Sequence, residues 1–393
     1  MRVLGIIAEY NPFHLGHAHH LAEARRLGLA DAVVVVMSSV FTQRGDAALL
    51  SPADRAQMAL AAGADAVFAL PAAWSVRDAE HFALGGVAIL AGLGCDAISF
   101  GTEVNALSAL QEAARLLEAP DEGFSAAVKA RMAAGLPYPA AVSSAMEAAL
   151  PGSGALLATP NSTLAVCYLR AMLRLGKHMD VVPIQRIGGF HDTRVQGALP
   201  SATALRGAIL RGDWATVSSA MPEEAYAILR DAAAHGRIHR PEALDGALLY
   251  RLRTMGDADY AALPDVSEGI ENRLAAAAAS ALSREELLQG AKTRRYPYAR
   301  LSRLTTHALL GMTDEALRAE ALPQAAWLLG FRRESRGLLT HFKERATLPV
   351  IGKAADIDRS TPWFAAETRA YDIWSLGAGM SAGLALTQGV TVL

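Results

Sequence analysis

Cysteine is scarce in this sequence, with only Cys95 and Cys167 among 393 residues. Two cysteines without paired metal-type spacing suggest neither a disulfide framework nor a zinc site, so we expect two reduced, packed thiols and no bound structural metal. Long apolar runs are missing as well. Although 52% of the residues are hydrophobic, no uncharged apolar run of about 18 residues is present to cross a bilayer. The sequence therefore predicts a soluble protein with no membrane partner.

A large excess of charge of either sign is also absent. The 37 Lys and Arg residues nearly balance the 39 Asp and Glu residues, which gives a net charge of −2. This excludes a general attraction to nucleic acid, and DNA is not an expected partner, so any polyanion must meet a local cluster of cations. The first residues lack the apolar core and cleavage pattern of a signal peptide, which predicts a cytoplasmic protein.

Short apolar runs alternate with helical stretches in the first half of the chain. Five runs have the length and composition of buried strands, at 3–8, 32–37, 66–70, 97–100 and 181–187. Helices between such runs indicate βαβ units, so we predict an α/β fold with a doubly wound parallel sheet. Residues from about 105 to 178 are rich in Ala, Leu and Glu and contain no convincing strand, which predicts a helical insertion.

The composition becomes that of helices after residue 201. Stretches such as 273–288 and 315–329 are rich in Ala, Leu, Glu and Arg. We therefore predict a first domain over 1–211 and a mainly α-helical C-terminal domain over 212–393. The terminal stretch from 348 to 374 is expected to add one or two strands and a short helix.

The strongest chemical signal is Asn11-Pro12-Phe13-His14-Leu15-Gly16-His17, directly after the first predicted strand. At such a position, the helix that follows offers unpaired N–H groups and a positive dipole end to a phosphate. Gly16 lets the backbone approach a ligand, and two imidazoles three residues apart can donate to phosphate oxygens as pyrophosphate leaves. Two nearby histidines alone are more often surface or core residues. Their place between a strand and a helix favours an ATP site that reacts at the α-phosphate.

The string from Gly5 to His17 resembles the H-x-G-H nucleotidylyltransferase superfamily and, within it, the tRNA(Met) cytidine acetate ligases. Further segments are similar to the same family in the same order, at 37–45, 100–103, 160–162, around Arg186, 201–206, 268–273 and 292–296. The resemblance implies a Rossmann-like catalytic domain over 1–211 and a helical domain that binds tRNA. It also implies that acetate displaces pyrophosphate from ATP, with Mg²⁺ on the phosphates. The acetyl group then passes to N4 of the wobble cytidine of elongator tRNA(Met).

This resemblance, combined with the predicted strand ends, gives a set of candidate site residues. His14 and His17 are the expected catalytic stabilisers of phosphate charge, and Arg44 is expected to reach the substrate from the loop after the second strand. The predicted ATP-binding residues are Ile7, Ala8, Glu9, Tyr10, Asn11, Pro12, Phe13, His14, Leu15, Gly16, His17, His20, Gly101, Asn161, Arg186, Ile187, Ser201, Thr203 and Arg206.

Several of these residues have plainer alternatives. Gly101 can be an ordinary glycine at the end of a strand, and Asn161 can be the N-cap of a helix over 163–175. Arg186 can be an exposed charge at a strand end or a donor to phosphate. The resemblance favours contact with ATP for all three.

The helix start at Ser201 is expected to form a second phosphate cradle, and it too has a plainer alternative. Ser201 and Thr203 suit a simple N-cap, although an N-cap leaves Arg206 unexplained. Arg44 can be a solvated loop residue. The family usually has a Lys-Trp pair shortly after this loop, where this chain has Ser-Pro-Ala-Asp followed by Arg55. Either the role of that Lys is lost or Arg55 replaces it.

A basic run over 292–303 interleaves tyrosines with cations, which suits phosphate contacts and stacking on an unpaired base. Most short basic runs are only solvated surface, and the resemblance favours RNA. The predicted RNA contacts are Lys292, Arg294, Arg295, Tyr296 and Arg300. The family often has Thr after the Tyr, where this chain has Pro297.

Two other functions remain open at this level. An H-x-G-H enzyme can join ATP to a small phosphorylated metabolite, although such an enzyme needs no long helical RNA-binding domain. The fold can also serve a non-catalytic ATP or RNA binder, for which His17 would be dispensable.

Overall fold

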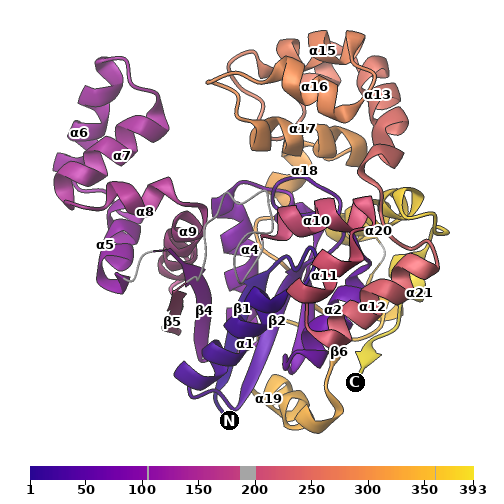
Figure 1. Ribbon diagram of the computed structural model, residues 1–393. Coiled ribbons are helices and arrows are strands. Elements are labelled where there is room, and N and C mark those ends of the chain that lie inside the picture. Colours follow the sequence, from indigo (N-terminus) through magenta and orange to yellow (C-terminus); the bar gives the residue numbers. More distant parts are fainter. Residues whose placement is uncertain (104–105, 186–200, 359) are drawn as a thin grey trace.

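The structure is a computed structural model that describes residues 1–393 apart from 104–105, 186–200 and 359. Within those residues, an eight-stranded mixed sheet forms the centre (Figure 1). The strands are β1 (Val3–Ala8), β2 (Ala32–Ser38), β3 (Ala66–Leu70), β4 (Ala97–Thr102), β5 (Asp180–Gln185), β6 (Ala326–Phe331), β7 (Val350–Ile351) and β8 (Thr391–Val392). Their order across the sheet is β5-β4-β1-β2-β3-β6-β7, and β8 pairs with β6.

The first five strands are parallel neighbours, which confirms the strands predicted from the sequence. β2 and β3 are buried at every position, as is typical of strands covered by helices on both faces. The strand order reverses at β1, because β2 lies on one side of it and β4 on the other. Such a reversal leaves a crevice at the carboxyl ends of the strands. The H-x-G-H segment begins at this point.

Helices α1 (Leu15–Leu27), α2 (Pro52–Ala61), α3 (Ala72–Ser75) and α4 (Ala79–Gly92) follow the first strands. Successive residues of a strand face opposite sides of a sheet. In β1, Leu4 packs toward Gly28 at the end of α1, whereas the backbone of Gly5 lies against Leu90 of α4. The two helices therefore cover opposite faces, which gives the doubly wound arrangement.

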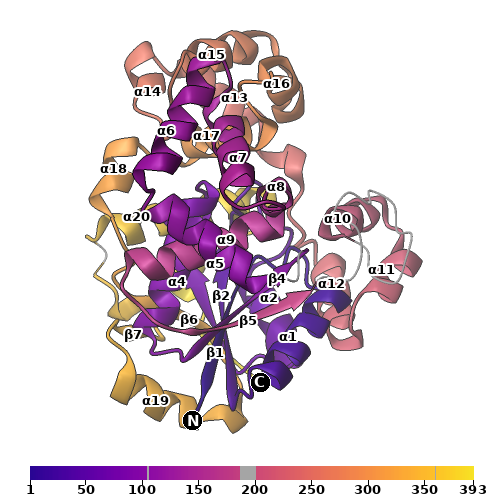
Figure 2. The same ribbon diagram turned by 90° about the vertical axis from the view of Figure 1, so that its left-hand side faces the viewer.

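The predicted helical insertion is confirmed between β4 and β5. Its helices are α5 (Leu107–Glu118), α6 (Glu122–Ala133), α7 (Tyr138–Ala149), α8 (Gly154–Ala158) and α9 (Pro160–Arg174). Arg170 and Arg174 of α9 pair with Glu80 of α4 and Glu118 of α5, so charged groups fix the insertion to the sheet layer. In both views, α6 and α7 stand above the carboxyl ends of the strands (Figures 1 and 2).

A second group of helices has a hydrophobic core of its own. After α10 (Ala202–Arg211), α11 (Trp214–Ala220) and α12 (Glu223–Ala234), the chain forms α13 (Asp245–Thr254), α14 (Asp257–Ala261), α15 (Ile270–Ser280), α16 (Arg284–Ala291) and α17 (Tyr298–Leu310). Leu248, Leu274, Leu288 and Leu301 belong to a cluster of buried residues separate from the main core. We call residues 245–310 the helical subdomain; it also stands above the carboxyl ends of the strands (Figure 1).

The packing at the end of the chain differs from the predicted domain division at 211/212. After α18 (Asp314–Ala319), β6 enters the main sheet antiparallel to β3, within a stretch whose composition predicts a helix. A short buried apolar run cannot be assigned to strand or helix from composition alone. α19 (Gly337–Arg345), α20 (Pro362–Gly377) and α21 (Leu384–Thr387) complete the chain. Trp374 of α20 is fully buried in the main core, so 212–393 is not one separate helical unit.

In the described part of the chain, no helix combines the length and the apolar composition needed to cross a membrane.

Candidate active site

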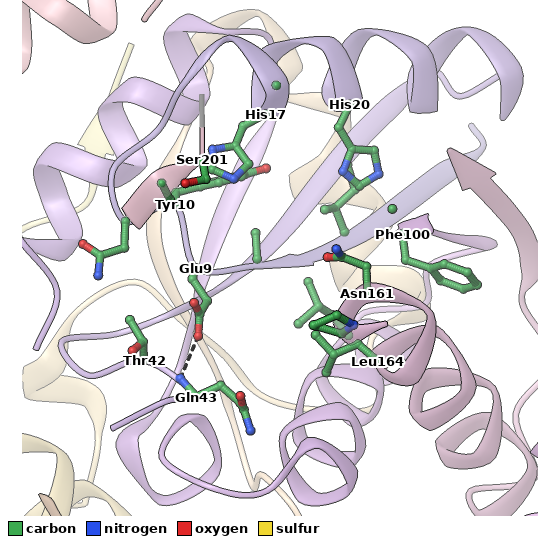
Figure 3. A pocket seen from close by; sticks show the side chains of 18 of the residues that line it. Glu9, Tyr10, His17, His20, Thr42, Gln43, Phe100, Asn161, Leu164 and Ser201 are labelled. Carbon is green, nitrogen blue, oxygen red and sulfur yellow. Dashed lines mark hydrogen bonds between the residues drawn. The ribbon is translucent and has the colours of Figure 1, made fainter. Parts of the chain in front are cut away.

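A cavity of about 730 Å³ opens at the carboxyl ends of β1 and β4. Its wall combines the H-x-G-H segment, the loop over 42–46, the start of α9 and the start of α10 (Figure 3). Most of the predicted site residues line it: Ile7, Ala8, Glu9, Tyr10, Asn11, His14, Gly16, His17, His20, Arg44, Gly101, Asn161, Ser201, Thr203 and Arg206. Arg186 and Ile187 lie outside the described residues.

The two motif histidines form a compact pair at the start of α1. His14 is the N-cap of the helix, and its Nδ1 accepts the N–H of Gly16 at 3.1 Å. The Nδ1 of His17 accepts the N–H of His14 at 3.3 Å, and the two rings stack with their centroids 3.7 Å apart. A Cβ at Gly16 would lie 2.9 Å from Cε1 of His14. Gly16 therefore leaves room for the His14 ring. This role is separate from the close approach of a ligand that the sequence predicts.

These contacts determine which tautomer each ring adopts when it is neutral. A neutral imidazole that accepts a backbone N–H at Nδ1 carries its own proton at Nε2. Both histidines can then act as Nε2–H donors toward an anion. The first turn of α1 adds backbone N–H groups and the positive end of the helix dipole.

Pro12, Phe13 and Leu15 are not among the described residues that line the cavity, so their contact with ATP stays a prediction. Phe13 is fully buried and meets Tyr10 edge-on at 4.8 Å between ring centroids. Tyr10 in turn lies 4.8 Å from the ring of His17. The aromatic residues therefore support the histidine pair from inside the protein.

Glu9 points into the cavity from the end of β1 (Figure 3). Its carboxylate accepts the N–H of Gln43 at 2.7 Å. Burial raises the pKa of Glu9, and the Gln43 N–H and the charges of Arg44 and Arg206 oppose that rise. The cavity thus contains a carboxyl group that the backbone of the loop over 42–46 holds in place.

Asn161 lines the cavity from α9, but it is not the N-cap of that helix, in contrast to the plainer alternative above. Thr159 is the N-cap residue, and Asn161 lies within the first turn of α9. The side-chain amide of Asn161 donates to Glu103, and the other oxygen of Glu103 accepts both the N–H and the hydroxyl of Ser162 at 2.9 Å. Burial would raise the pKa of Glu103, but the hydrogen bonds outweigh it and lower the pKa. Glu103 thus orients Asn161 and anchors α9.

Ser201 caps α10 as predicted, since its hydroxyl accepts the N–H of Ala204 at 3.2 Å. Arg206 reaches across the cavity wall. It donates to the carbonyl of Asn11 at 2.9 Å and to the hydroxyl of Thr203 at 3.1 Å. An N-cap alone does not account for Arg206, whereas these contacts do, because its guanidinium connects the start of α10 to the H-x-G-H segment.

Arg55 does not replace the missing Lys at the cavity. Its side chain is fully buried and donates to the carbonyls of Glu9 at 2.8 Å, Ser38 at 2.9 Å and Leu50 at 3.2 Å, and also to that of Ser39. Burial lowers the pKa of Arg55 to about 10. The guanidinium joins the carboxyl ends of β1 and β2 from behind the site.

The basic run is only partly available to RNA. The side chain of Tyr296 is buried and its hydroxyl donates to the carbonyl of Glu268 at 2.5 Å, so the ring packs within the helical subdomain. Its contact with RNA stays a prediction. Arg295 pairs with the Glu268 carboxylate at 2.7 Å, and Arg300 donates to the carbonyl of Asp265 at 2.7 Å. Lys292 and Arg294 are exposed.

The sequence interpretation missed several residues that shape the cavity. Thr42, Gln43 and Asp46 line it together with Arg44, and Glu103 acts through Asn161. Thr42, Gln43 and Glu103 lie in segments that resemble the ligase family, and Asp46 directly follows one of them. This was the signal from which they could have been found.

The chain that combines this strand-order reversal, histidine pair and second capped helix matches a known class of protein. The family model described as HIGH Nucleotidyl Transferase matches residues 1–383. Within that class, the chain belongs to the family of tRNA(Met) cytidine acetate ligases.

Two curated members and one solved structure document the similarity. The tRNA(Met) cytidine acetate ligase of Geobacillus sp. (strain WCH70) is 35% identical over 365 residues, which are 91% of this chain and 90% of the relative. The ligase of Acetivibrio thermocellus is 34% identical over 375 residues, or 92% and 90% of the two chains. The crystal structure of Thermotoga maritima TmcAL bound with alpha-thio ATP superposes with a TM-score of 0.91, 27% identity and full coverage of both chains.

Proposed function

We propose that this enzyme activates acetate on ATP and transfers the acetyl group to a cytidine of tRNA(Met), as the names of its relatives indicate. One observation carries the proposal: two helix starts, a pair of histidines and Arg206 converge on a single cavity. That combination suits a triphosphate whose α-phosphate reacts. The related structure with alpha-thio ATP supports the same ligand.

In the first step, an oxygen of acetate attacks the α-phosphorus and the bond to the β-phosphate bridging oxygen breaks. Acetyl-adenylate and pyrophosphate form. His14 and His17 would donate from Nε2 to the phosphate oxygens, and the starts of α1 and α10 would cradle the triphosphate. Arg206 would neutralise developing charge, and Arg44 would approach the reacting carboxylate. The protein supplies positioning and electrostatic stabilisation, with no covalent intermediate on a side chain.

The nucleoside would occupy the half of the cavity away from the phosphate-binding starts of α1 and α10. Gly101 at the end of β4, His20 and Asn161 line that half. His20 is held by a 3.0 Å hydrogen bond to Ser99, and Asn161 is held by Glu103. Polar groups fixed in this way can select a base or ribose without reorganising when the ligand binds.

In the second step, N4 of the cytidine attacks the acetyl carbon and AMP leaves with one oxygen that came from acetate. We infer that the base is the wobble cytidine of elongator tRNA(Met), a reaction of the cytoplasm where ATP and tRNA are available. The helical subdomain would hold the RNA. The exposed cations Lys292, Arg294 and Arg295 are suited to phosphate contacts.

Mg²⁺ is compatible with this cavity as an ion held mainly by the phosphates. Among the described residues, no group of three or more His, Cys, Asp or Glu side chains could form a metal cage. Mg²⁺ often needs only one or two carboxylates besides phosphate and water. Asp46 lines the cavity and would be the contributing carboxylate, and the ion would neutralise the leaving pyrophosphate.

The test is an incubation of the protein with ATP, ¹⁴C-acetate and tRNA(Met). We expect label in the RNA as N4-acetylcytidine and one AMP for each acetyl group. Pyrophosphate release that requires a small phosphorylated acceptor and no RNA would instead indicate a nucleotidylyltransferase and overturn the proposal.

A further inference from the structure

The loop over 42–46 lies between two parts of the molecule. One side of the loop lines the cavity through Thr42, Gln43, Arg44 and Asp46. The other side lies against α16 and α17 of the helical subdomain, although more than 230 residues separate them in sequence. The loop therefore connects the subdomain with the candidate active site.

Arg284, the first residue of α16, makes the central contact. It donates to the carboxylate of Asp46 at 3.1 Å and to the carbonyl of Gly45 at 3.0 Å. The same guanidinium donates to the hydroxyl of Ser302 at 2.6 Å and to that of Thr305 at 3.2 Å. A planar guanidinium with several fixed partners defines the position of a loop more closely than a single ion pair can.

α17 adds direct backbone contacts to this link. The hydroxyl of Ser302 donates to the carbonyl of Arg44 at 2.5 Å, and that of Thr306 donates to the carbonyl of Gly45. Gly45 has a φ of +80°, and a Cβ there would lie 2.8 Å from the backbone of Ser302 and Arg303. A residue with a side chain would be strained there and would separate the loop from α17. Ser302 and Thr306 are buried, so water cannot easily replace these bonds.

The opposite side of the loop meets the reaction site. The N–H of Gln43 holds the carboxylate of Glu9, and the side-chain amide of Gln43 donates to the carbonyl of Arg77 at 2.8 Å. Arg44 is held at its backbone carbonyl by Ser302, and it also lines the cavity. A movement of Gly45 or Asp46 away from the subdomain would therefore move both Gln43 and Arg44.

We propose that Arg284 is a positioning residue of the acetate activation reaction. From the helical subdomain it holds the loop over 42–46 so that Gln43 contacts Glu9 and Arg44 faces the cavity. The helical subdomain thus completes the catalytic centre in addition to holding RNA. This inference rests on the proposed function, because it assigns the loop a role in that reaction.

The test compares Arg284→Gln with Arg273→Gln in the full-length protein. Arg273 is a matched control in the same subdomain, where it donates to the carbonyls of Ala291 at 2.7 Å and Gly290 at 3.3 Å. For R284Q we expect kcat for acetate-dependent AMP formation to fall roughly 10- to 100-fold, the range expected when a catalytic group is slightly misplaced. The KM for ATP should stay within about twofold, because the phosphate cradle of α1 and α10 is unchanged.

Hydrogen exchange provides a readout that is independent of activity. Amides of the peptide over 41–48 should exchange faster in R284Q than in wild type and remain protected in R273Q. If R284Q does not fold, Ser302→Ala removes a partner of both Arg284 and Arg44 and should show the same two effects at smaller size.

Equal kcat and equal exchange for R284Q and R273Q would overturn the inference. Faster exchange with wild-type kcat would overturn it too, since the contact would then be structural only. A wild-type protein that forms no acetyl-adenylate would contradict the proposed function itself, and the exchange comparison would still decide whether Arg284 holds the loop.

Discussion

At the scale of single residues, the histidine pair defines what the site can do. Each Nδ1 is occupied by a backbone N–H, so each neutral ring presents its proton at Nε2. Such rings are donors, suited to stabilising an anion that forms as a phosphate bond breaks. The rings of Tyr10 and Phe13 both contact the ring of His17 and hold it in place.

His17→Ala should lower the rate of acetate-dependent AMP formation by at least 100-fold, because one charge-stabilising donor is lost from the reacting phosphate. His235→Ala is the control, since His235 is exposed and bonds to Asp231 one turn earlier in the chain. Steady-state AMP release measures both. Near wild-type activity of H17A would show that His17 does not stabilise charge on the reacting phosphate.

Arg55→Met should destabilise the protein by about 3 kcal/mol or more, because it leaves several buried carbonyls without a donor. Arg26→Met is the control, since Arg26 makes an exposed pair with Glu23 of the same helix. Urea unfolding followed by circular dichroism measures the free energy of unfolding of each variant. Equal values for the two variants would show that Arg55 does not join β1 and β2 as described.

The sequence predicted those site residues whose contacts are local. The cap at Ser201 and the helix start after His14 follow from residues three apart, and both are confirmed. The support of Asn161 by Glu103 and the burial of Arg55 depend on segments 58 and 46 residues apart. Local patterns contain no information on such pairings. The same limit explains why the burial of Tyr296 against Glu268 was not predicted.

At the scale of elements, α20 is the helix whose position could not be predicted from the sequence. Its composition is that of an ordinary amphipathic helix, yet Glu367, Tyr371 and Trp374 are fully buried. Trp374 donates from Nε1 to the carbonyl of Ala48 at 2.6 Å, and Glu367 accepts the N–H of Ala72 at 2.5 Å. The C-terminal helix therefore stabilises the loops that follow β2 and β3.

Burial raises the pKa of Glu367 from about 4.5 to about 7. The native protein then binds this proton more tightly than the unfolded chain does, so the contribution of Glu367 to stability falls as pH rises from about 4.5 to about 7. Relative to wild type, Glu367→Gln should be more stable at pH 8 than at pH 5, by up to roughly 3 kcal/mol.

Urea unfolding of wild type and E367Q at the two pH values measures this difference. Glu344→Gln, at an exposed position of α19, controls for a general effect of replacing a carboxylate by an amide. If the stability difference between E367Q and wild type is the same at pH 5 and pH 8, burial does not raise the pKa of Glu367 as described.

At the scale of the whole molecule, two groups of helices lie above one end of the sheet. The insertion helices α6 and α7 and the helical subdomain both stand above the carboxyl ends of the strands (Figures 1 and 2). A macromolecular substrate bound by the subdomain would therefore lie at the same end as the cavity. The sequence predicted the five parallel strands, because each is a buried run between helices. It did not predict that β6 and α20 return to the main core, because that packing joins the two ends of the chain.

The double variant Lys292→Glu and Arg294→Glu should weaken binding of tRNA(Met) at least tenfold near physiological salt. It should also reduce the slope of log affinity against log salt by about two, because two phosphate contacts are lost. The control is Lys343→Glu with Arg333→Glu, two exposed cations near α19 at the opposite end of the molecule (Figure 1). Filter binding at several salt concentrations measures both. Equal weakening by the two double variants would place the RNA elsewhere.

The fate of the acetate oxygens tests the central claim most directly. Attack of acetate at the α-phosphorus followed by acetyl transfer leaves one acetate oxygen on AMP. We therefore predict that turnover with [¹⁸O₂]acetate, ATP and tRNA(Met) yields AMP that contains one ¹⁸O atom by mass spectrometry, together with acetylated RNA. Recovery of the ¹⁸O in inorganic phosphate, or unlabelled AMP beside acetylated RNA, would contradict activation of acetate at the α-phosphate.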